Sequence, residues 1–553
     1  MIRSRGRRGA HRPAVTSTVP AIAAAMSVAM SLAMLVAMAM AITVAVAATD
    51  APASVASGEA FYRTGLLPGG KSITAMTQAD VKTTSALLSC ASCHLASGLG
   101  SAEAGRAAPS LRWHRLASAG NNTRGVRPAY NDTTLIRALR EGLDPAGRQL
   151  DPLMPRYVLD DAAANDLLAF LHSRSDKPSP GASPTRIELA TVIAPDAIPA
   201  QREAMLAVLT RFVDDHNAEA ARQQALGERD RSATRRIART WGLSIWTLEG
   251  EPASWPQQLA AAEATKPAFV LLSGIAGSEW APVSAFSNAG GPPSLLPNVD
   301  TPPSDVDGGR TLYFFGGLRL EARVIASTIV AAHDKSVLQI YRPGGRSEFA
   351  AQAFRSAMSR VSNLTVREST IDALTGTAPS DPGAIVLWLD QDDLATLPAI
   401  EAGTHVYLSS TLLDGAISRT PPIQSRAPIS LVHPFAVGAS RSLRLRPTQA
   451  WLSARGIAPG EERIQEQTLF ACRLLEETLA HLTDEQLDRE YVLERVDHTV
   501  GPFAHSGTYP NASFGPGQRS LSKGAYLVPL APPGEPLWLI PTVADGTGDS
   551  SPR

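Results

Sequence analysis

The stretch Cys90-Ala91-Ser92-Cys93-His94 decides how the first part of this chain is interpreted. Its Cys-x-x-Cys-His spacing is the pattern of covalent c-type haem attachment, in which each sulfur forms a thioether with one vinyl group. On a helical turn this spacing places both sulfurs on one side, and His94 can reach the iron from that side. The alternatives are a thioredoxin-like redox pair or half of a zinc site. The sequence favours haem, because a single Cys-x-x-Cys lacks the second ligand pair of a zinc site and no βαβ pattern surrounds it.

The composition is that of a globular protein with more than one domain. A chain of 553 residues is long enough for two or three domains. Its formal net charge of -1 argues against a nucleic acid or another polyanion as partner. The third cysteine, Cys472, stands alone, which excludes a structural framework of disulfides. It lies in an apolar helical stretch, residues 468–475, where we expect a buried thiol.

Residues 1–48 have the features of a signal peptide. Five arginines precede an apolar stretch from about Pro20 to Ala48, and residues 45–47 form a small-x-small cleavage site. We expect cleavage; the alternative is an uncleaved anchor, because the apolar run is long enough to cross a bilayer. Either way we expect the rest of the chain in the periplasm, in contact with the membrane only through an uncleaved N-terminal segment.

A stretch rich in proline and serine, residues 176–185, divides the remaining chain. We interpret it as a stiff, solvated linker. Residues 55–175 contain the haem motif and predict helices joined by loops. Residues 186–545 alternate apolar strands with amphipathic helices, a pattern typical of parallel sheets covered on both faces. The polar residues 546–553 are expected to form a disordered tail.

Hydrophobic spacing predicts individual elements in both parts. In the first part we expect helices around residues 132–141 and from residue 160 or 161 to 171. In the second part we expect helices at residues 201–216 and 255–264. Strands are expected at residues 187–193, 243–248, 267–274, 336–341, 384–389 and 405–410.

The iron of a His-ligated haem needs a sixth ligand or keeps an open position. Met154 is the best candidate, because it lies between two prolines in a loop sixty residues after His94. A thioether ligand raises the reduction potential. The alternatives are that Met154 is an ordinary packed side chain, or that His114 or His172 is the ligand. Without a sixth ligand, a small gas such as NO or CO could bind.

Residues 55–175 resemble the class I cytochrome c family. Besides the attachment motif, the resemblance rests on a Gly- and aromatic-containing first helix, a glycine turn, a proline loop, the approach to the methionine, and a closing helix. These are residues 57–62, 98–100, 108–111, 138–142 and 167–171. The resemblance implies an all-α domain with one covalent haem c. It further implies His94 as proximal ligand, Met154 as distal ligand, and Pro109 as the residue whose carbonyl orients His94.

Residues 186–545 resemble type I periplasmic solute-binding proteins of the branched-chain amino acid class. The resemblance rests on a strand, turn and helix start, on the following strand, and on a C-terminal hairpin. These are residues 269–283, 292–298 and 515–528. It implies two α/β lobes joined by crossing strands, with a small-molecule solute in the cleft. The first turn departs from the family, since residues 194–198 lack its usual glycines.

A helix start near Ser278 offers a physical reason for a solute site. A helix N-terminus presents N–H groups and a positive dipole end to a carboxylate, and Trp280 can pack on an apolar ligand. Asn298 and Tyr313 are further candidates for the cleft. The alternative is that Ser278 only caps its helix and Trp280 packs in the core.

Two weaker patterns have simpler interpretations. Residues 390–393, Asp-Gln-Asp-Asp, lack the remaining spacing of a calcium loop and predict an acidic helix start. His498 and His505 have no paired cysteine or close histidine, and we interpret them as surface residues.

Together these patterns predict a periplasmic monohaem cytochrome fused to a solute-binding-like domain. We expect an electron-transfer protein rather than a catalyst, with a redox partner protein that is a dehydrogenase or another cytochrome. The second hypothesis is a haem-linked solute sensor, in which ligand binding and haem redox state are coupled.

Overall fold

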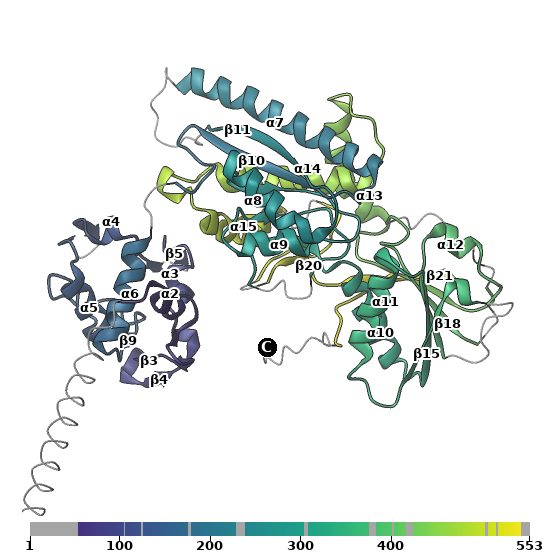
Figure 1. The fold of residues 1–553 in the computed structure, drawn as a ribbon, viewed down its shortest axis with the longest axis horizontal. Helices are drawn as coiled ribbons and strands as arrows, with labels where there is room; N and C mark the ends of the chain where they lie inside the picture. Colours follow the sequence, from purple (N-terminus) through teal and green to yellow (C-terminus); the bar gives the residue numbers. More distant parts are fainter. Residues whose placement is uncertain are drawn as a thin grey trace, which may run out of the picture. The chain divides into compact units, whose positions relative to one another are not determined.

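The chain forms two compact units, and each is described by itself (Figure 1). The smaller unit consists of residues 53–90 and 117–174, and the larger of residues 91–116 and 178–543. The computed structural model describes residues 53–103, 106–122, 125–174, 178–227, 238–303, 308–374, 383–400, 403–415, 423, 425–503, 507–515 and 518–543. The expected signal peptide and C-terminal tail lie outside the described residues. Within these ranges, no helix is both long and apolar enough to cross a membrane.

The smaller unit is built on three helices joined by loops and short strands. Its helices are α2 (Val55–Thr64), α5 (Asp132–Glu141) and α6 (Asp161–Ser173), with 3-10 turns η1 (Gln78–Asp80) and η2 (Ala86–Leu88). Its strands are β1 (Leu66–Leu67), β2 (Lys71–Ser72), β3 (Thr74–Met76), β4 (Lys82–Thr84), β7 (Gly120–Asn122), β8 (Gly125–Arg127) and β9 (Arg156–Tyr157). Helices α5 and α6 match the sequence predictions. They begin at caps, Asn131 and Asp160, whose side chains accept N–H groups of the first turn.

The close packing of α2 on α6 holds the smaller unit together. A Cβ atom on Gly58 would lie 2.0 Å from the carbonyl oxygen of Asp166, so only glycine permits this approach. Tyr62 of α2 packs on Phe170 of α6, with ring centroids 5.2 Å apart. Phe61 packs edge-on against Tyr157, at 5.7 Å.

The first lobe of the larger unit is a six-stranded parallel sheet. Its strand order is β11-β10-β12-β13-β14-β20. The strands are β10 (Arg186–Ile193), β11 (Thr240–Thr247), β12 (Val270–Leu272), β13 (Ser294–Leu295), β14 (Thr311–Phe315) and β20 (Ser520–Ser522). The helices are α7 (Pro199–Gly227), α8 (Trp255–Thr265), α9 (Ala281–Asn288), α14 (Glu462–Leu479) and α15 (Arg489–Phe503), with η3 (Pro252–Ser254) and η5 (Asp484–Gln486).

Alternate residues of β10 supply two apolar cores, one on each face of this sheet. Ile187 and Leu189 belong to the core that includes residues of α7 and α14. Ala190 and Val192 belong to the core that includes residues of α8 and α9. Because side chains alternate along a strand, a strand buried on both faces reads as a continuous apolar run. Cys472 of α14 is fully buried in the first core, as expected.

The second lobe repeats the strand order of the first and adds two antiparallel strands. Its order is β16-β15-β17-β18-β19-β21-β22, so both lobes are doubly wound in the order 2-1-3-4-5. The strands are β15 (Ser336–Tyr341), β16 (Thr365–Thr370), β17 (Ala384–Trp388), β18 (His405–Ser409), β19 (Ile429–His433), β21 (Ala525–Ala531) and β22 (Leu537–Leu539). The helices are α10 (Gly317–Ala331), α11 (Gly345–Met358) and α12 (Gln391–Ala395), with η4 (Ile371–Ala373). Helix α13 (Gly438–Ser453), which follows β19, packs on α7 and α14 of the first lobe. The expected two-lobed α/β architecture is confirmed.

The C-terminal strands differ from the expected hairpin within residues 515–528. Strand β20 pairs with β14 in the first lobe, whereas β21 pairs with β19 and β22 in the second. The chain therefore crosses between the lobes after β20, as it does after β14 and after β19. The hairpin is instead formed by β21 and β22.

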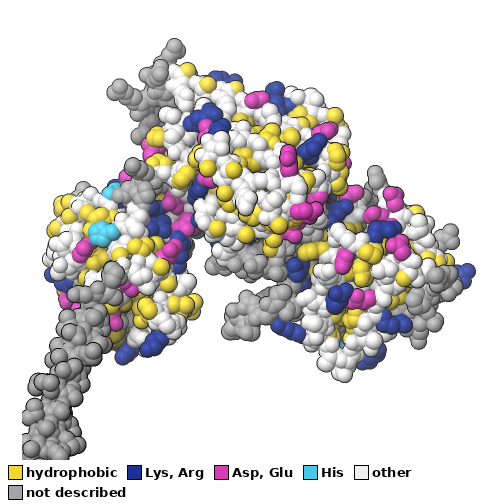
Figure 2. Space-filling view, viewed as in Figure 1, with side chains coloured by type: hydrophobic (Ala, Val, Ile, Leu, Met, Phe, Trp, Pro, Cys, Tyr) yellow, Lys and Arg dark blue, Asp and Glu magenta, His cyan; other side chains and the backbone are white. Residues whose placement is uncertain are grey.

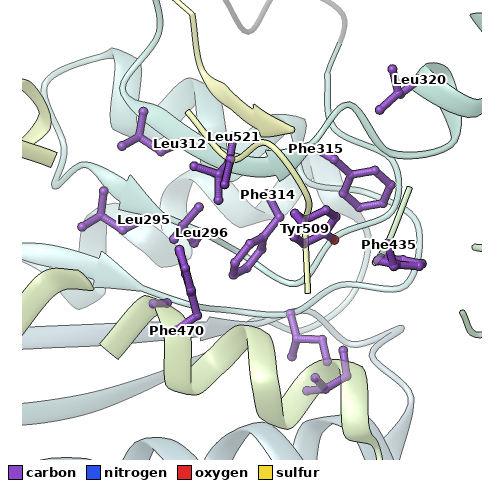
Figure 3. Packing of buried hydrophobic residues seen from close by; sticks show 14 of the residues in the cluster. Leu295, Leu296, Leu312, Phe314, Phe315, Leu320, Phe435, Phe470, Tyr509 and Leu521 are labelled. Atoms are coloured by element: carbon purple, nitrogen blue, oxygen red, sulfur yellow. The ribbon is translucent and has the colours of Figure 1, made fainter. Parts of the chain in front are cut away.

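Aromatic side chains pack together where the chain crosses between the lobes (Figure 3). The ring of Tyr509, which precedes β20, lies 5.6 Å from that of Phe314 and 5.3 Å from that of Phe315, both at the end of β14. It also lies 5.4 Å from the ring of Phe435, which follows β19. One aromatic cluster thus joins the crossings after β14 and β19.

A buried carboxylate, Asp300, links the lobes beside these crossings. Its oxygens lie 2.8 Å from Nη1 of Arg463 in α14 and 2.9 Å from Nη1 of Arg346 in α11 of the second lobe. Burial opposes ionisation, but the two guanidinium groups outweigh it and hold the pKa of Asp300 below its ordinary value.

The described part of the expected linker, residues 178–185, is half-buried or exposed, and hydrogen bonds tie it to the rest of the larger unit. The N–H of Ser179 donates to the carbonyl of Leu487 at 2.8 Å, and its hydroxyl oxygen accepts from the N–H of Arg489 at 3.1 Å. Composition alone favoured a solvated stretch. The contacts with η5 and α15, some three hundred residues later, give these backbone groups their partners.

On the face of the larger unit seen in Figure 2, Lys and Arg side chains are interspersed with Asp and Glu side chains. This distribution agrees with the net charge of -1.

Glu321 in α10 is a fully buried carboxyl group in the second lobe. It accepts hydrogen bonds from the hydroxyls of Ser409 and Thr411, the latter at 2.6 Å, and from the N–H of Thr411 at 3.2 Å. Burial raises its pKa from 4.5 to about 8, although these donors lower it. The native protein therefore binds one more proton at this position than the unfolded chain between pH 4.5 and 8.

We predict that Glu321 makes the free energy of unfolding fall as pH rises from 5 to 8, because unfolding releases a proton that the native state retains, and this release becomes more favourable as pH rises. Glu321→Gln, which resembles the protonated acid, should show a flatter dependence. Urea unfolding at pH 5, 6.5 and 8 measures both slopes. Parallel curves for the two proteins would contradict this assignment.

Candidate functional site

Residues 91–94 of the Cys-x-x-Cys-His motif form a short helical turn of the larger unit, and a hydrogen bond fixes the His94 ring. Helix α3 (Ala91–His94) ends at this residue, whose side chain is buried. Nδ1 of His94 lies 2.8 Å from the carbonyl oxygen of Pro109. A carbonyl accepts only from a protonated ring nitrogen, so Nδ1 carries the proton and Nε2 is the nitrogen that can bind a metal. Burial also lowers the pKa of His94, which favours the neutral ring that metal binding requires.

The turn after the motif brings Pro109 to His94. A Cβ atom on Gly100, whose φ is +85°, would lie 2.3 Å from the carbonyl oxygen of Ala108, so this position requires glycine. The N–H of Leu111 donates to the carbonyl of Gly98 at 2.8 Å, and the hydroxyl of Ser110 contacts the same carbonyl at 3.2 Å. Strands β5 (Ser101–Glu103) and β6 (Arg106–Ala108) pair between Gly100 and Pro109, and α4 (Trp113–Leu116) follows.

The two motif cysteines differ in exposure. Cys90, the last residue of the smaller unit, is buried, whereas Cys93 is exposed. The carbonyl of Cys93 accepts from the hydroxyl of Ser101 at 2.7 Å. This bond fixes the end of α3 immediately before His94.

Met154 lies in a loop of the smaller unit that is tied to the segment before Cys90. Its N–H donates to the carbonyl of Asp151 at 2.9 Å, and its side chain is half-buried. Three residues later, the hydroxyl of Tyr157 donates to the carbonyl of Leu88 at 2.8 Å. The smaller unit therefore places the methionine loop beside the residues that lead into the motif.

The two competing histidines have acidic partners. Nε2 of His172, near the end of α6, lies 2.9 Å from Asp132, and Nε2 of His114 in α4 lies 3.7 Å from Glu485. In both cases the acidic partner faces Nε2. The donor types of Cys90, Cys93, His94 and Met154 are those that a covalent haem c requires.

In the expected solute cleft, the helix start near Ser278 is already bound by a carboxylate of the chain. One oxygen of Asp196 accepts from the N–H of Ser278 at 2.7 Å and from its hydroxyl at 2.6 Å. The other accepts from the N–H of Gly277 at 3.0 Å. Asp196 therefore occupies the position that a solute carboxylate was expected to take.

The other three cleft candidates are buried in the first lobe. Trp280 and Tyr313 are part of the core that includes residues of α8 and α9. Nδ2 of Asn298 donates to the hydroxyl oxygen of Ser273 at 2.8 Å, and its backbone N–H to the carbonyl of Gly274 at the same distance. These side chains support the turn between β12 and α9.

The acidic run at residues 390–393 begins a helix, as the sequence favours. Asp390 caps α12 by accepting the N–H of Asp393 at 2.9 Å. Asp393 in turn pairs with Arg342. In the described ranges, no group of three or more His, Cys, Asp or Glu residues could hold a metal ion. His498 is exposed in α15, and His505 lies outside the described residues.

Sequence reasoning missed the carboxylates that complete these sites. Asp196 stands in the turn that departs from the family, and its bond to Ser278 spans 82 residues. Asp488 and Glu494, which contact Arg112 and Ser97 beside the motif, are 376 and 397 residues away from them. No local pattern signals such pairs.

Comparison with known proteins gives matches to solved structures only. No protein-family model matches the chain, and no curated protein matches it. A leucine-binding protein from Thermotoga maritima is 12% identical over 64% of this chain and 97% of its own, with a TM-score of 0.38. A branched-chain amino acid substrate-binding protein from Streptococcus pneumoniae, in complex with isoleucine, is 11% identical over 65% of this chain and 100% of its own, with a TM-score of 0.42. A branched-chain amino acid ABC transporter protein from Thermus thermophilus, with bound valine, is 11% identical over 64% of this chain and 97% of its own, with a TM-score of 0.43. Because these scores are below 0.5, the fold of the larger unit rests on its own strand order.

We predict that Asp196→Ala lowers the free energy of unfolding by about 1–2 kcal/mol, because three donors lose their acceptor. Sodium acetate should raise the urea midpoint of this variant more than that of the wild-type protein, since a free carboxylate can enter the vacated position. Sodium chloride at equal ionic strength is the control. An equal effect of acetate on both proteins would show that the position does not bind carboxylates.

Proposed function

We propose that this protein is a periplasmic c-type cytochrome that carries single electrons through one covalent haem c, with a fused solute-binding-like domain. The main support for this proposal is the 2.8 Å contact between Nδ1 of His94 and the carbonyl oxygen of Pro109. His94 directly follows the Cys-x-x-Cys spacing. A redox cysteine pair needs no oriented histidine beside it. A metal-ligating histidine commonly donates its other ring N–H to such an acceptor.

Four side chains of the chain would hold the group. Cys90 and Cys93 supply the thioether sulfurs, Nε2 of His94 the proximal ligand, and the sulfur of Met154 the distal ligand. When bound with both axial positions filled, a haem supplies one-electron exchange and no bond chemistry on a substrate. The residues of this chain then set the orientation and basicity of the proximal ligand through Pro109.

The larger unit serves this function as a docking or recognition module. Its two α/β lobes support a solute-binding-like domain, and the partners would be a dehydrogenase or another cytochrome. The signal-like residues 1–48 support a periplasmic location. This location fits the proposed cofactor, because haem c is attached outside the cytoplasmic membrane.

The second candidate function is a sensor in which solute binding and haem redox state are coupled. One observation favours it: residues 91–116, which carry His94, pack within the larger unit rather than the smaller. This candidate predicts that a bound solute shifts the reduction potential. Valine and isoleucine, the ligands in two of the similar structures, are the first solutes to test. No shift with any solute that binds would eliminate the coupled version.

We predict that Met154→Ala abolishes the absorption band of methionine-to-iron ligation while haem stays attached. The physical reason is that the thioether sulfur is lost but both cysteines remain. Leu153→Ala, at an exposed neighbouring position of the same loop, is the matched control and should retain the band. Absorption spectra of the oxidised full-length proteins measure both. A band that persists in Met154→Ala would overturn the ligand assignment.

A further inference from the structure

Residues 91–116, termed here the motif segment, are built into the larger unit by apolar and ionic contacts. Leu95 and Leu99 pack against the main apolar core. Nη2 of Arg112 lies 2.6 Å from Asp488, and the two side chains are only 6% and 19% exposed. The N–H of Ser97 donates to Glu494 at 2.9 Å. Such a segment is held by the lobe it contacts and not only by its own turns.

Asp488 is itself held rigidly at the start of α15. One of its carboxylate oxygens accepts the N–H groups of Glu490 at 2.9 Å and Tyr491 at 3.1 Å. The other pairs with Arg112. Because the cap orients the carboxylate, the position of the Arg112 guanidinium is fixed relative to α15.

A short chain of contacts connects Arg112 to the proximal histidine. The N–H of Arg112 donates to the hydroxyl oxygen of Ser110 at 3.2 Å, and Ser110 in turn contacts the carbonyl of Gly98. Only two residues separate Arg112 from Pro109, whose carbonyl is bonded to His94. A displacement of Arg112 therefore moves the acceptor that fixes the histidine ring.

We propose that Asp488 is a positioning residue, which through Arg112 holds the Pro109 carbonyl on Nδ1 of His94 and so tunes the proximal ligand from the larger unit. This inference rests on the proposed haem function. The hydrogen bond to Nδ1 raises the basicity of the ligating nitrogen, so its weakening changes how well the oxidised and reduced states of a bound haem are stabilised.

The chain offers a matched control pair in the same segment. Nε of Arg115 lies 2.9 Å from Glu485, but these side chains are 56% and 44% exposed. Exposed ion pairs contribute little, and Arg115 lies farther along the segment from Pro109. Loss of this pair should leave His94 unchanged.

The test compares Asp488→Asn with Glu485→Gln in the full-length protein. Asparagine caps helices as well as aspartate does, so Asp488→Asn removes the ion pair and keeps α15. In haem-free protein with ¹⁵N-labelled histidine, with the signal assigned by His94→Gln, we expect the fraction of His94 protonated at Nε2 to rise at least threefold in Asp488→Asn. In haem-loaded protein at the wild-type midpoint potential, the ratio of reduced to oxidised haem should change at least threefold. Glu485→Gln should change neither.

Each outcome decides one claim. If the protein is produced in cells that attach haem c and contains no haem, the proposed function is wrong. The ¹⁵N signal of His94 in the haem-free protein still decides whether Asp488 positions His94. If haem is attached but Asp488→Asn behaves as Glu485→Gln in both measurements, the positioning role is overturned. If the histidine signal changes and the ratio does not, the contact stands and the tuning of the haem is overturned.

Discussion

The buried carboxylate of Asp300 is the constraint on which the two-lobed arrangement depends. A lone charge at this depth would be prohibitively unfavourable, so it requires both Arg463 from α14 and Arg346 from the second lobe. Removing either partner of a buried ion pair costs about 3–5 kcal/mol, because the remaining charge is left without compensation. The aromatic rings around Tyr509 pack at the same crossings. Any movement of one lobe on the other must therefore keep this ion pair or replace it.

This constraint bears on what the larger unit can recognise. A solute that enters between lobes competes with contacts that the chain already makes. The carboxylate of Asp196 occupies the donors near Ser278 that an acidic solute was expected to use. A domain filled in this way is suited to contact proteins, or to bind solutes that displace its own carboxylate.

The sequence predicts the features that depend on neighbours along the chain. Helices α5 and α6 are signalled by caps and by apolar residues three and four apart, and β10 by its run from Ile187 to Ile193. The Cys-x-x-Cys-His pattern and the approach of Pro109 to His94 are recognisable because they involve specific residues at short spacing. The pairs Asp196–Ser278 and Arg112–Asp488 could not be predicted, because any of many carboxylates can meet a given donor once the chain folds. The linker shows the same limit, since its polar composition does not reveal that η5 and α15 bind it.

The position of the motif segment in the chain has a consequence for how the protein matures. Its partner Asp488 follows Arg112 by 376 residues. At ordinary rates of synthesis the Cys-x-x-Cys-His motif is complete about 20–80 s before that partner exists. Thioether formation in this interval would act on an early, unanchored peptide, and the ion pair would form only after nearly the whole chain had followed. Attachment of the group and adjustment of its ligand would then be separate events in the life of one polypeptide.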